Sequence, residues 1–131
     1  MGRIVTFVTL TNVLSPESTF TCDALVDTGA AYTTLPNAWR KRLGTLRVLE
    51  KVEVETADQS VIEGEICGPV EIQMEGFRPI LTEVLFIDME PDDGSFDPLI
   101  GYTTLELAHA AVDMVGHRLI NIKRVDLKSA F

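Results

Sequence analysis

Residues 24–30 read ALVDTGA: three apolar residues run into Asp27, and Gly29 follows two positions later. The apolar residues are typical of a half-buried strand, and a glycine permits a tight backbone turn that a Cβ would resist. Such a turn holds a carboxylate at the end of a rigid strand, with the Thr28 hydroxyl beside it. Asp-x-Gly alone is also common in ordinary surface turns, so a second segment is needed to indicate a function.

Pro98-Leu99-Ile100-Gly101 is that second segment. Like the first, it is a run of apolar residues that is followed by a glycine. Leu99 and Ile100 can pack beneath a loop that carries a catalytic group, and Gly101 lets two backbones approach closely. The ordinary alternative is the end of a core strand, and a core position is compatible with this supporting role.

Around these two segments, apolar and polar residues alternate with the period of two that β-strands have. The pattern predicts strands at Ile4–Leu10, Phe20–Val26, Val48–Thr56, Val61–Cys67, Val70–Met74 and Ile80–Ile87. Two short helices are predicted, at Pro36–Leu43 and at Thr103–Ala111. Many short strands with one or two short helices indicate a mostly-β barrel or sandwich. Since no repeat or linker divides the chain, we expect one domain over residues 1–131.

Composition and charge exclude several classes of protein. Hydrophobic residues make up 46% of the chain, which excludes an intrinsically disordered protein. The 11 Lys and Arg against 20 Asp and Glu give a net charge of −9, which repels phosphate groups. We therefore expect no nucleic-acid partner and no membrane partner. No apolar run approaches the roughly 20 residues of a transmembrane helix, and no secretory signal opens the sequence, so we expect a cytoplasmic protein.

The metal-ligating residue types do not form a metal motif. Cys22 and Cys67 lie in separate apolar runs, where reduced thiols are usual, and neither belongs to a Cys-x-x-Cys pair. His109 and His117 have no carboxylate or cysteine at ligand spacing, so we expect them at the surface or at a helix end. The acidic loop 88–97 fails the calcium-binding EF-hand pattern. We expect no metal and no cofactor.

Together, the motifs resemble those of the retropepsin-like aspartic proteases, the family of the retroviral proteases and their cellular relatives. The matching pieces are Asp27-Thr28-Gly29-Ala30, Thr33 or Thr34 followed by Leu35, a hairpin around Val54 to Ile66, and Leu99-Ile100-Gly101. Residues 111–120 are similar to the closing hairpin of the bacterial and archaeal single-domain branch. The resemblance covers roughly Ile4 to Ile120 in the family's order. It implies a small closed β-barrel with one or two short helices.

The resemblance also implies an aspartic endopeptidase in which Asp27 is the catalytic residue. This chemistry needs two carboxylates that share a proton, and the chain carries a single Asp-Thr-Gly. The implied enzyme is therefore a homodimer that brings together two copies of Asp27. Thr28 would hold the pair by hydrogen bonds across the dimer axis, and Gly29 and Ala30 would contact the substrate. Support from below would come from Leu99, Ile100 and Gly101.

A flap is implied as well, which would cover an extended peptide or protein substrate and exclude water. Its residues would be Ala57, Asp58, Gln59, Ser60, Val61 and Ile62. The tip Asp58-Gln59-Ser60 lacks the glycines of the viral enzymes. Viral enzymes also commonly carry an acidic residue directly after Asp-Thr-Gly-Ala and an arginine directly after the Ile-Gly pair. Here Ala31 and Tyr102 stand at those positions, so both members of that ion pair are absent together.

Two other functions remain open from the sequence. The first is a non-catalytic dimeric module that binds extended peptides without cleaving them. The second is a monomeric β-barrel without a peptide site, in which Asp27 is a turn residue.

Overall fold

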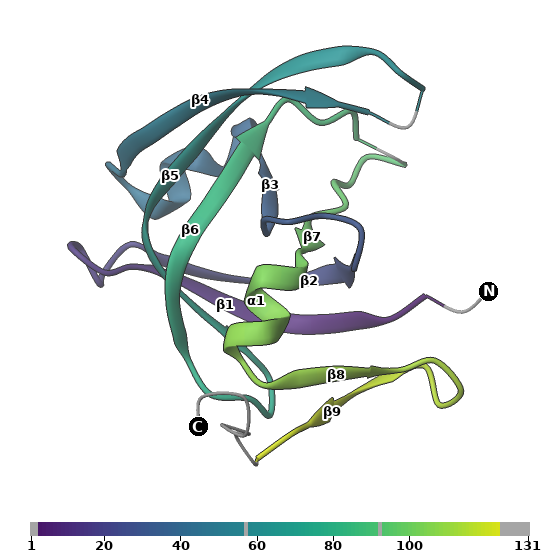
Figure 1. Cartoon of the computed structure of the whole chain (residues 1–131). Helices are drawn as coiled ribbons and strands as arrows, with labels where there is room; N and C mark the ends of the chain where they lie inside the picture. The colour runs from purple at the N-terminus through teal and green to yellow at the C-terminus, as the bar shows by residue number, and fades with distance from the viewer. Residues whose placement is uncertain (1–2, 57, 92, 124–131) are drawn as a thin grey trace, which may run out of the picture.

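The computed structural model describes residues 3–56, 58–91 and 93–123, and over these the chain is built mainly from β-strands (Figure 1). In chain order the elements are β1 (Val5–Asn12), β2 (Thr19–Val26), β3 (Thr34–Pro36), the 3-10 helix η1 (Asn37–Leu43), β4 (Arg47–Glu55), β5 (Val61–Met74), β6 (Ile80–Ile87), β7 (Leu99–Ile100), α1 (Tyr102–Leu107), β8 (Ala110–Asp113) and β9 (Arg118–Asn121). The predicted fold class, a small closed β-barrel with one or two short helices, is confirmed.

Six strands close into a ring, in the order β1-β2-β7-β3-β6-β5, and β5 returns to pair with β1. The closing ladder runs from Val8 opposite Met74 to Asn12 opposite Val70. Closure gives each of these strands a neighbour on both sides, so their backbone groups are satisfied within the sheet. β4 pairs with β5 alone, and among the described residues it is the strand of this sheet that keeps a free edge.

The barrel interior is filled by the inward-facing residues of the alternating strands. In β2 the more buried residues Phe20, Cys22 and Ala24 alternate with exposed Thr21 and Asp23. The largest fully buried apolar side chains are Phe86, Leu10, Leu35, Leu43, Ile72, Met74 and Ile100. β8 and β9 form a separate two-stranded sheet whose inward side chains pack against this core.

Four predicted elements differ from the structure. The strands predicted at Val61–Cys67 and Val70–Met74 are one strand, β5, whose pairing with β6 shifts register between them. The helix predicted at Thr103–Ala111 ends at Leu107, because His109 has a φ of 57° and the chain then enters β8. The predicted helix at Pro36–Leu43 is a 3-10 helix that begins after Pro36 and ends at Gly44, which has a φ of 64°.

One side of the molecule gathers the segments that the sequence singled out. Figure 1 shows the end of β2, the turn between β4 and β5, and the turn between β8 and β9 all directed to the same side. The β4–β5 hairpin lies in the predicted flap position above the end of β2. No helix in the described ranges is long and apolar enough to cross a membrane.

Candidate active site

The backbone around Asp27 is held by hydrogen bonds on both sides. Asp27 N donates to Ile100 O at 3.0 Å, which continues the β2–β7 pairing one residue past the end of β2. Ala30 N donates to Asp27 O at 3.2 Å, and Gly29 N donates to Asp27 Oδ1 at 2.9 Å. The half-buried carboxylate is therefore fixed at the end of a rigid strand, as the sequence predicts.

The sequence suggests that Gly29 is needed for an unusual turn conformation of the backbone. The structure gives a different reason for a glycine at this position. Its φ is not among the positive values of the chain, so no left-handed backbone is involved. A Cβ at this position would lie 3.2 Å from Asp27 Oδ1, which is tighter than ordinary contact. The glycine thus leaves room for the carboxylate to accept the Gly29 N–H.

Leu99, Ile100 and Gly101 lie directly beneath this loop. β7 runs between β2 and β3, with Leu99 opposite both Leu25 and Thr34. At Gly101 a Cβ would lie 2.4 Å from the carbonyl carbon of Tyr32 and 2.5 Å from its oxygen, so no side chain fits there. Tyr102 N donates to Ala30 O at 2.7 Å. The close backbone approach predicted for Gly101 is confirmed.

A buried pair of threonines completes the support. Thr33 Oγ1 and Thr104 Oγ1 lie 2.7 Å apart in a hydrogen bond, and Gly101 N donates to Thr33 Oγ1 at 3.3 Å. Of the two threonines that the sequence left open, Thr33 therefore joins the network, whereas Thr34 Oγ1 donates to Tyr32 O. Thr104 was not predicted, because 71 residues separate it from its partner and no local pattern links the two.

Strand register shows which side chains share a face with Asp27. Leu25 lies two residues before Asp27, so the two side chains point to the same side. Leu25 is opposite Leu99, Leu99 is opposite Thr34, and Thr34 is opposite Leu85. From Leu85 the face continues across β6 and β5 to β4. We call it the cleft face, and its residues are Leu25, Thr34, Val52, Val54, Ile62, Gly64, Ile66, Leu85, Ile87 and Leu99.

Gly64 confirms the direction of this face. A Cβ on Gly64 would lie 2.9 Å from Leu85 Cδ1 and 3.0 Å from Ile87 Cγ2, so the side chains of β6 lean over β5 at this point. Apart from Thr34, whose hydroxyl donates to Tyr32 O, the side chains of the cleft face are apolar from the neighbourhood of Asp27 to the flap.

The flap tip is folded by its own hydrogen bonds. Thr56 N donates to Ser60 O and Gln59 N donates to Thr56 O, both at 2.9 Å. Asp58 Oδ1 accepts from Ser60 N at 3.1 Å, from Ser60 Oγ at 2.6 Å and from Thr56 Oγ1. These bonds, those of Ser60 and Thr56 first, lower the pKa of the Asp58 carboxyl from 3.8 to about 2. Gln59 takes the left-handed φ of 68° that a glycine would otherwise supply.

The remaining predicted flap residues fall as follows. Val61 and Ile62 begin β5, with Val61 exposed and Ile62 half-buried on the cleft face. Ala57 lies outside the described residues.

Residues 17–104 match the family model described as aspartyl protease. The chain belongs to the aspartyl protease family. Among solved structures it is similar to the EIAV protease complexed with the inhibitor HBY-793, at 24% identity and a TM-score of 0.60. That match covers 80% of this chain and 86% of the viral chain, and it shows a shared fold. No curated protein sequence matches.

In this member of the aspartyl protease family, Asp27 lies on an open face of the described chain. Among the cavities that the described residues form, three have volumes of about 600 Å³, and Asp27, Thr28 and Gly29 line none of these three. Thr28 is exposed, and its hydroxyl makes no hydrogen bond within the described chain. The side chains named for catalysis thus lie together at one surface, without a wall opposite them.

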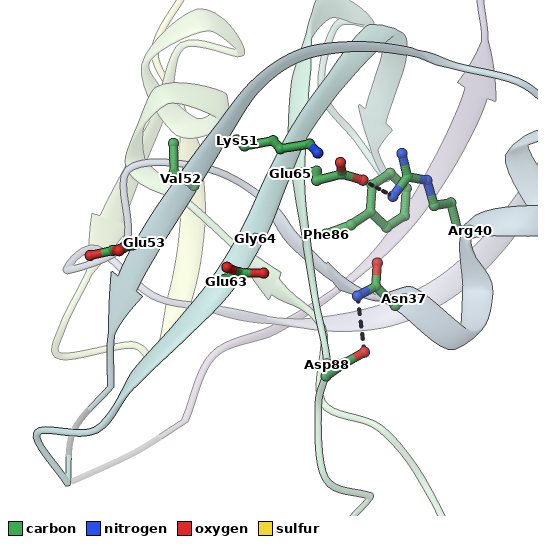
Figure 2. A pocket seen from close by; sticks show the side chains of 10 residues that line it. All are labelled: Asn37, Arg40, Lys51, Val52, Glu53, Glu63, Gly64, Glu65, Phe86 and Asp88. Atoms are coloured by element: carbon green, nitrogen blue, oxygen red, sulfur yellow. Dashed lines mark hydrogen bonds and ion pairs between the residues drawn. The ribbon is translucent and has the colours of Figure 1, made fainter.

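One cavity of about 600 Å³ lies on the opposite side of the flap sheet (Figure 2). Glu53, Glu63 and Glu65 alternate with the cleft-face residues of β4 and β5, so they point away from Asp27. Arg40 of η1 pairs with Glu65 Oε1, and its guanidinium lies 5.3 Å from the Phe86 ring centroid. These contacts fasten η1 to the base of the flap, and the cavity contains no predicted site residue.

The two cysteines are free thiols, as the sequence predicts. Burial, with a smaller contribution from Asp23, raises the pKa of the half-buried Cys22 thiol from 9.0 to about 11. Burial also raises the pKa of the Cys67 thiol, which lies in the core. A raised pKa favours the protonated thiol, which is a weak nucleophile, so neither cysteine has the lowered pKa of a reactive thiol.

Proposed function

We propose that the protein is an aspartic endopeptidase that acts as a homodimer, with one Asp27 from each subunit forming the catalytic pair. The observation that supports this most directly is the position of Asp27. Its carboxylate accepts from Gly29 N, its backbone N–H donates to Ile100 O, and the half-buried side chain lies on the open face beside the flap. A two-fold axis through that face would place the second carboxylate and a second flap opposite the first.

Two such carboxylates cannot both ionise cheaply when they are close, so they share one proton. The ionised carboxylate accepts a proton from a water molecule as that water attacks the scissile carbonyl carbon. The protonated carboxyl donates its proton to the carbonyl oxygen, which gives a tetrahedral diol. Collapse of the diol breaks the C–N bond, and the amine leaves with a proton. This mechanism requires the singly protonated pair, so cleavage is fastest at mildly acidic pH and falls above neutral pH.

The cleft face supports the choice of an extended peptide as substrate. Its side chains are apolar except that of Thr34, so the residues beside the scissile bond would be apolar too. An extended peptide can also pair its main chain with the flap and with the loop at Gly29, as an added strand does.

The test is cleavage of a diverse peptide library between about pH 4 and 7, the range in which carboxylates and their pairs titrate. We expect Asp27→Asn to lower the cleavage rate by about 100-fold or more. Asp23→Asn is the matched control, because Asp23 is an exposed carboxylate on the same strand, and it should cleave as the wild type does. Cleavage by Asp27→Asn at the wild-type rate, or a monomer at high concentration in sedimentation, contradicts the proposal.

One observation favours a second candidate, the dimeric module that binds extended peptides without cleaving them. Ala31 and Tyr102 stand where viral enzymes carry a charged pair, and the flap tip carries Asp58-Gln59-Ser60 in place of glycines. A confirmed dimer that binds peptides while neither the wild type nor Asp27→Asn cleaves them would support this candidate over the enzyme.

A further inference from the structure

A cavity of about 630 Å³ opens beside the loop that follows Asp27. It lies between that loop, the first residues of α1 and the adjoining parts of β4, β5 and β6. We call it the outer groove, and its lining includes Ala31, Tyr32, Leu49, Leu81, Glu83 and Tyr102.

The outer groove continues the cleft face. Along β6, Leu81 and Glu83 alternate in the same phase as Leu85 and Ile87, so all four side chains point to the side of the sheet that carries Asp27. On β5, a Cβ at Gly68 would lie 3.5 Å from Glu83 Cβ, which places the groove against β5 as well. Same-face residues on a strand are about 7 Å apart. The groove therefore begins about two residues of extended peptide beyond Leu85.

Large apolar surfaces line the outer groove, beside the charged side chains of Arg47 and Glu83. Tyr102, Leu49 and Leu81 are 43%, 46% and 64% exposed, and Tyr32 is half-buried. Neither tyrosine hydroxyl makes a hydrogen bond in the part of the chain that is described. A concave surface of two aromatic rings and two leucines gains free energy by covering an apolar side chain, and aromatic pairs add to that gain.

The floor of the outer groove is rigid and joined to the loop of Asp27. Tyr102 N donates to Ala30 O at 2.7 Å, and Thr103 N donates to Ala31 O at 3.2 Å. Gly101 is pressed against the Tyr32 backbone beneath them. Because little ordering is needed on binding, a side chain in the groove would fix the register of the substrate relative to Asp27.

We propose that the outer groove is a subsite for a bulky apolar or aromatic side chain of the substrate, about two to four residues from the scissile bond. The proposal rests on the proposed function, since it takes the occupant to be the same extended peptide. Ala31 and Tyr102 are both uncharged. An ion pair at these two positions would remove the Tyr102 ring and would place two charges in the outer groove.

The first experiment compares peptides that share one cleaved core and differ at a single outlying position, which is Phe, Leu, Ser, Asp or Lys. We expect kcat/KM about tenfold higher for Phe or Leu than for Ser, chiefly through a lower KM, from the apolar area buried. In Tyr102→Ser this ratio should fall close to one, and in Tyr102→Phe it should persist because the hydroxyl has no partner. Leu14→Ser, at an exposed position in the β1–β2 turn, should keep the full ratio.

The second experiment separates this proposal from the catalytic one. The same peptides are titrated onto Asp27→Asn, and their Kd values are measured by calorimetry. We expect the Phe peptide to bind about tenfold more tightly than the Ser peptide, and Tyr102→Ser in the same background should remove the difference. Equal binding of the two peptides, or a preference that survives Tyr102→Ser, overturns the outer groove whether or not the wild type cleaves. Loss of cleavage with the binding preference intact overturns the proposed function alone.

Discussion

At position 101 a side chain of any size would meet the backbone of Tyr32. The nearest atoms to a Cβ there are main-chain atoms, at 2.4 to 2.8 Å, and main-chain atoms of a packed loop cannot move aside independently. The loop that carries Asp27 and the start of α1 therefore fit together only with glycine at this position.

We predict that Gly101→Ala destabilises the protein by about 3 kcal/mol, at the upper end of what overpacking costs. Urea denaturation followed by circular dichroism measures the loss. Gly116→Ala is the control, because its Cβ would lie at a similar 2.5 Å, but from the carboxylate end of the half-buried Asp113 side chain. That carboxylate can rotate away at the expense of its hydrogen bonds from Val115 N, Gly116 N and Arg118 Nε, whereas the Tyr32 backbone cannot move, so Gly116→Ala should cost less. Equal losses for the two variants would contradict the backbone explanation.

Asp27 and Gly101 could be singled out from the sequence because each stands in a short motif whose chemistry is local. The reason for Gly29 could not, since it depends on where the Asp27 carboxylate points. The hydrogen bond between Thr33 and Thr104 could not be predicted either, because it forms only when the segment before β3 packs against α1.

The flap tip is an element whose shape depends on one carboxylate. Asp58 accepts from Thr56 and from both the hydroxyl and the N–H of Ser60, and these bonds need the ionised form. Because its pKa is lowered from 3.8 to about 2, the contribution of Asp58 to the turn is complete above about pH 4 and is lost as the pH falls through 2. The tip should therefore stay ordered between pH 4 and 7, where cleavage is measured.

We predict that the Ser60 amide signal in NMR titrates with a midpoint near pH 2, and that Asp58→Ala removes this titration. The amide of Val115 is an internal comparison, because it donates to Asp113, a second carboxylate whose pKa is lowered by hydrogen bonds. A Ser60 midpoint near the ordinary 3.8 would show that these bonds do not form in solution.

Long elements could be predicted from the alternation, and short ones could not. β6 agrees with its predicted bounds, and β1, β2 and β4 agree within two residues. β3 has three residues, too few to show a period, and it is a strand because β6 and β7 lie on either side of it. The end of α1 was misplaced because Ala110 and Ala111 favour helix locally, whereas pairing with β9 places them in a strand.

For the whole molecule, the net charge of −9 acts against the proposed dimer. Bringing two such subunits together costs electrostatic free energy, and salt screens it, since the Debye length falls from about 10 Å at 0.1 M to about 3 Å at 1 M. We predict that raising sodium chloride over this range tightens the dimer several-fold in analytical ultracentrifugation. Potassium chloride should give the same result, which excludes specific ion binding. A dimer constant that is indifferent to salt, or weakened by it, contradicts this argument.

The order of the motifs along the chain was enough to predict a barrel, and the single Asp-Thr-Gly was enough to predict a second copy. The cleft face was not predictable at this scale. It depends on the register of six strands, and a shift of one residue in any of them would turn its side chains to the other face.

The free edge of β4 has a consequence for how this protein behaves when it is concentrated. A closed barrel offers no template for pairing with other chains, so β4 is where the described sheet could grow from one molecule to the next. Its sequence, RVLEKVEVE, places a charge at five of nine positions, and all five of those side chains are exposed. Like charges on neighbouring edges keep such strands apart. The same glutamates and lysine, which contribute little to the core, thus oppose fibril-like association between molecules. Replacing them with uncharged residues would promote aggregation at high protein concentration before it lowered the stability of the fold.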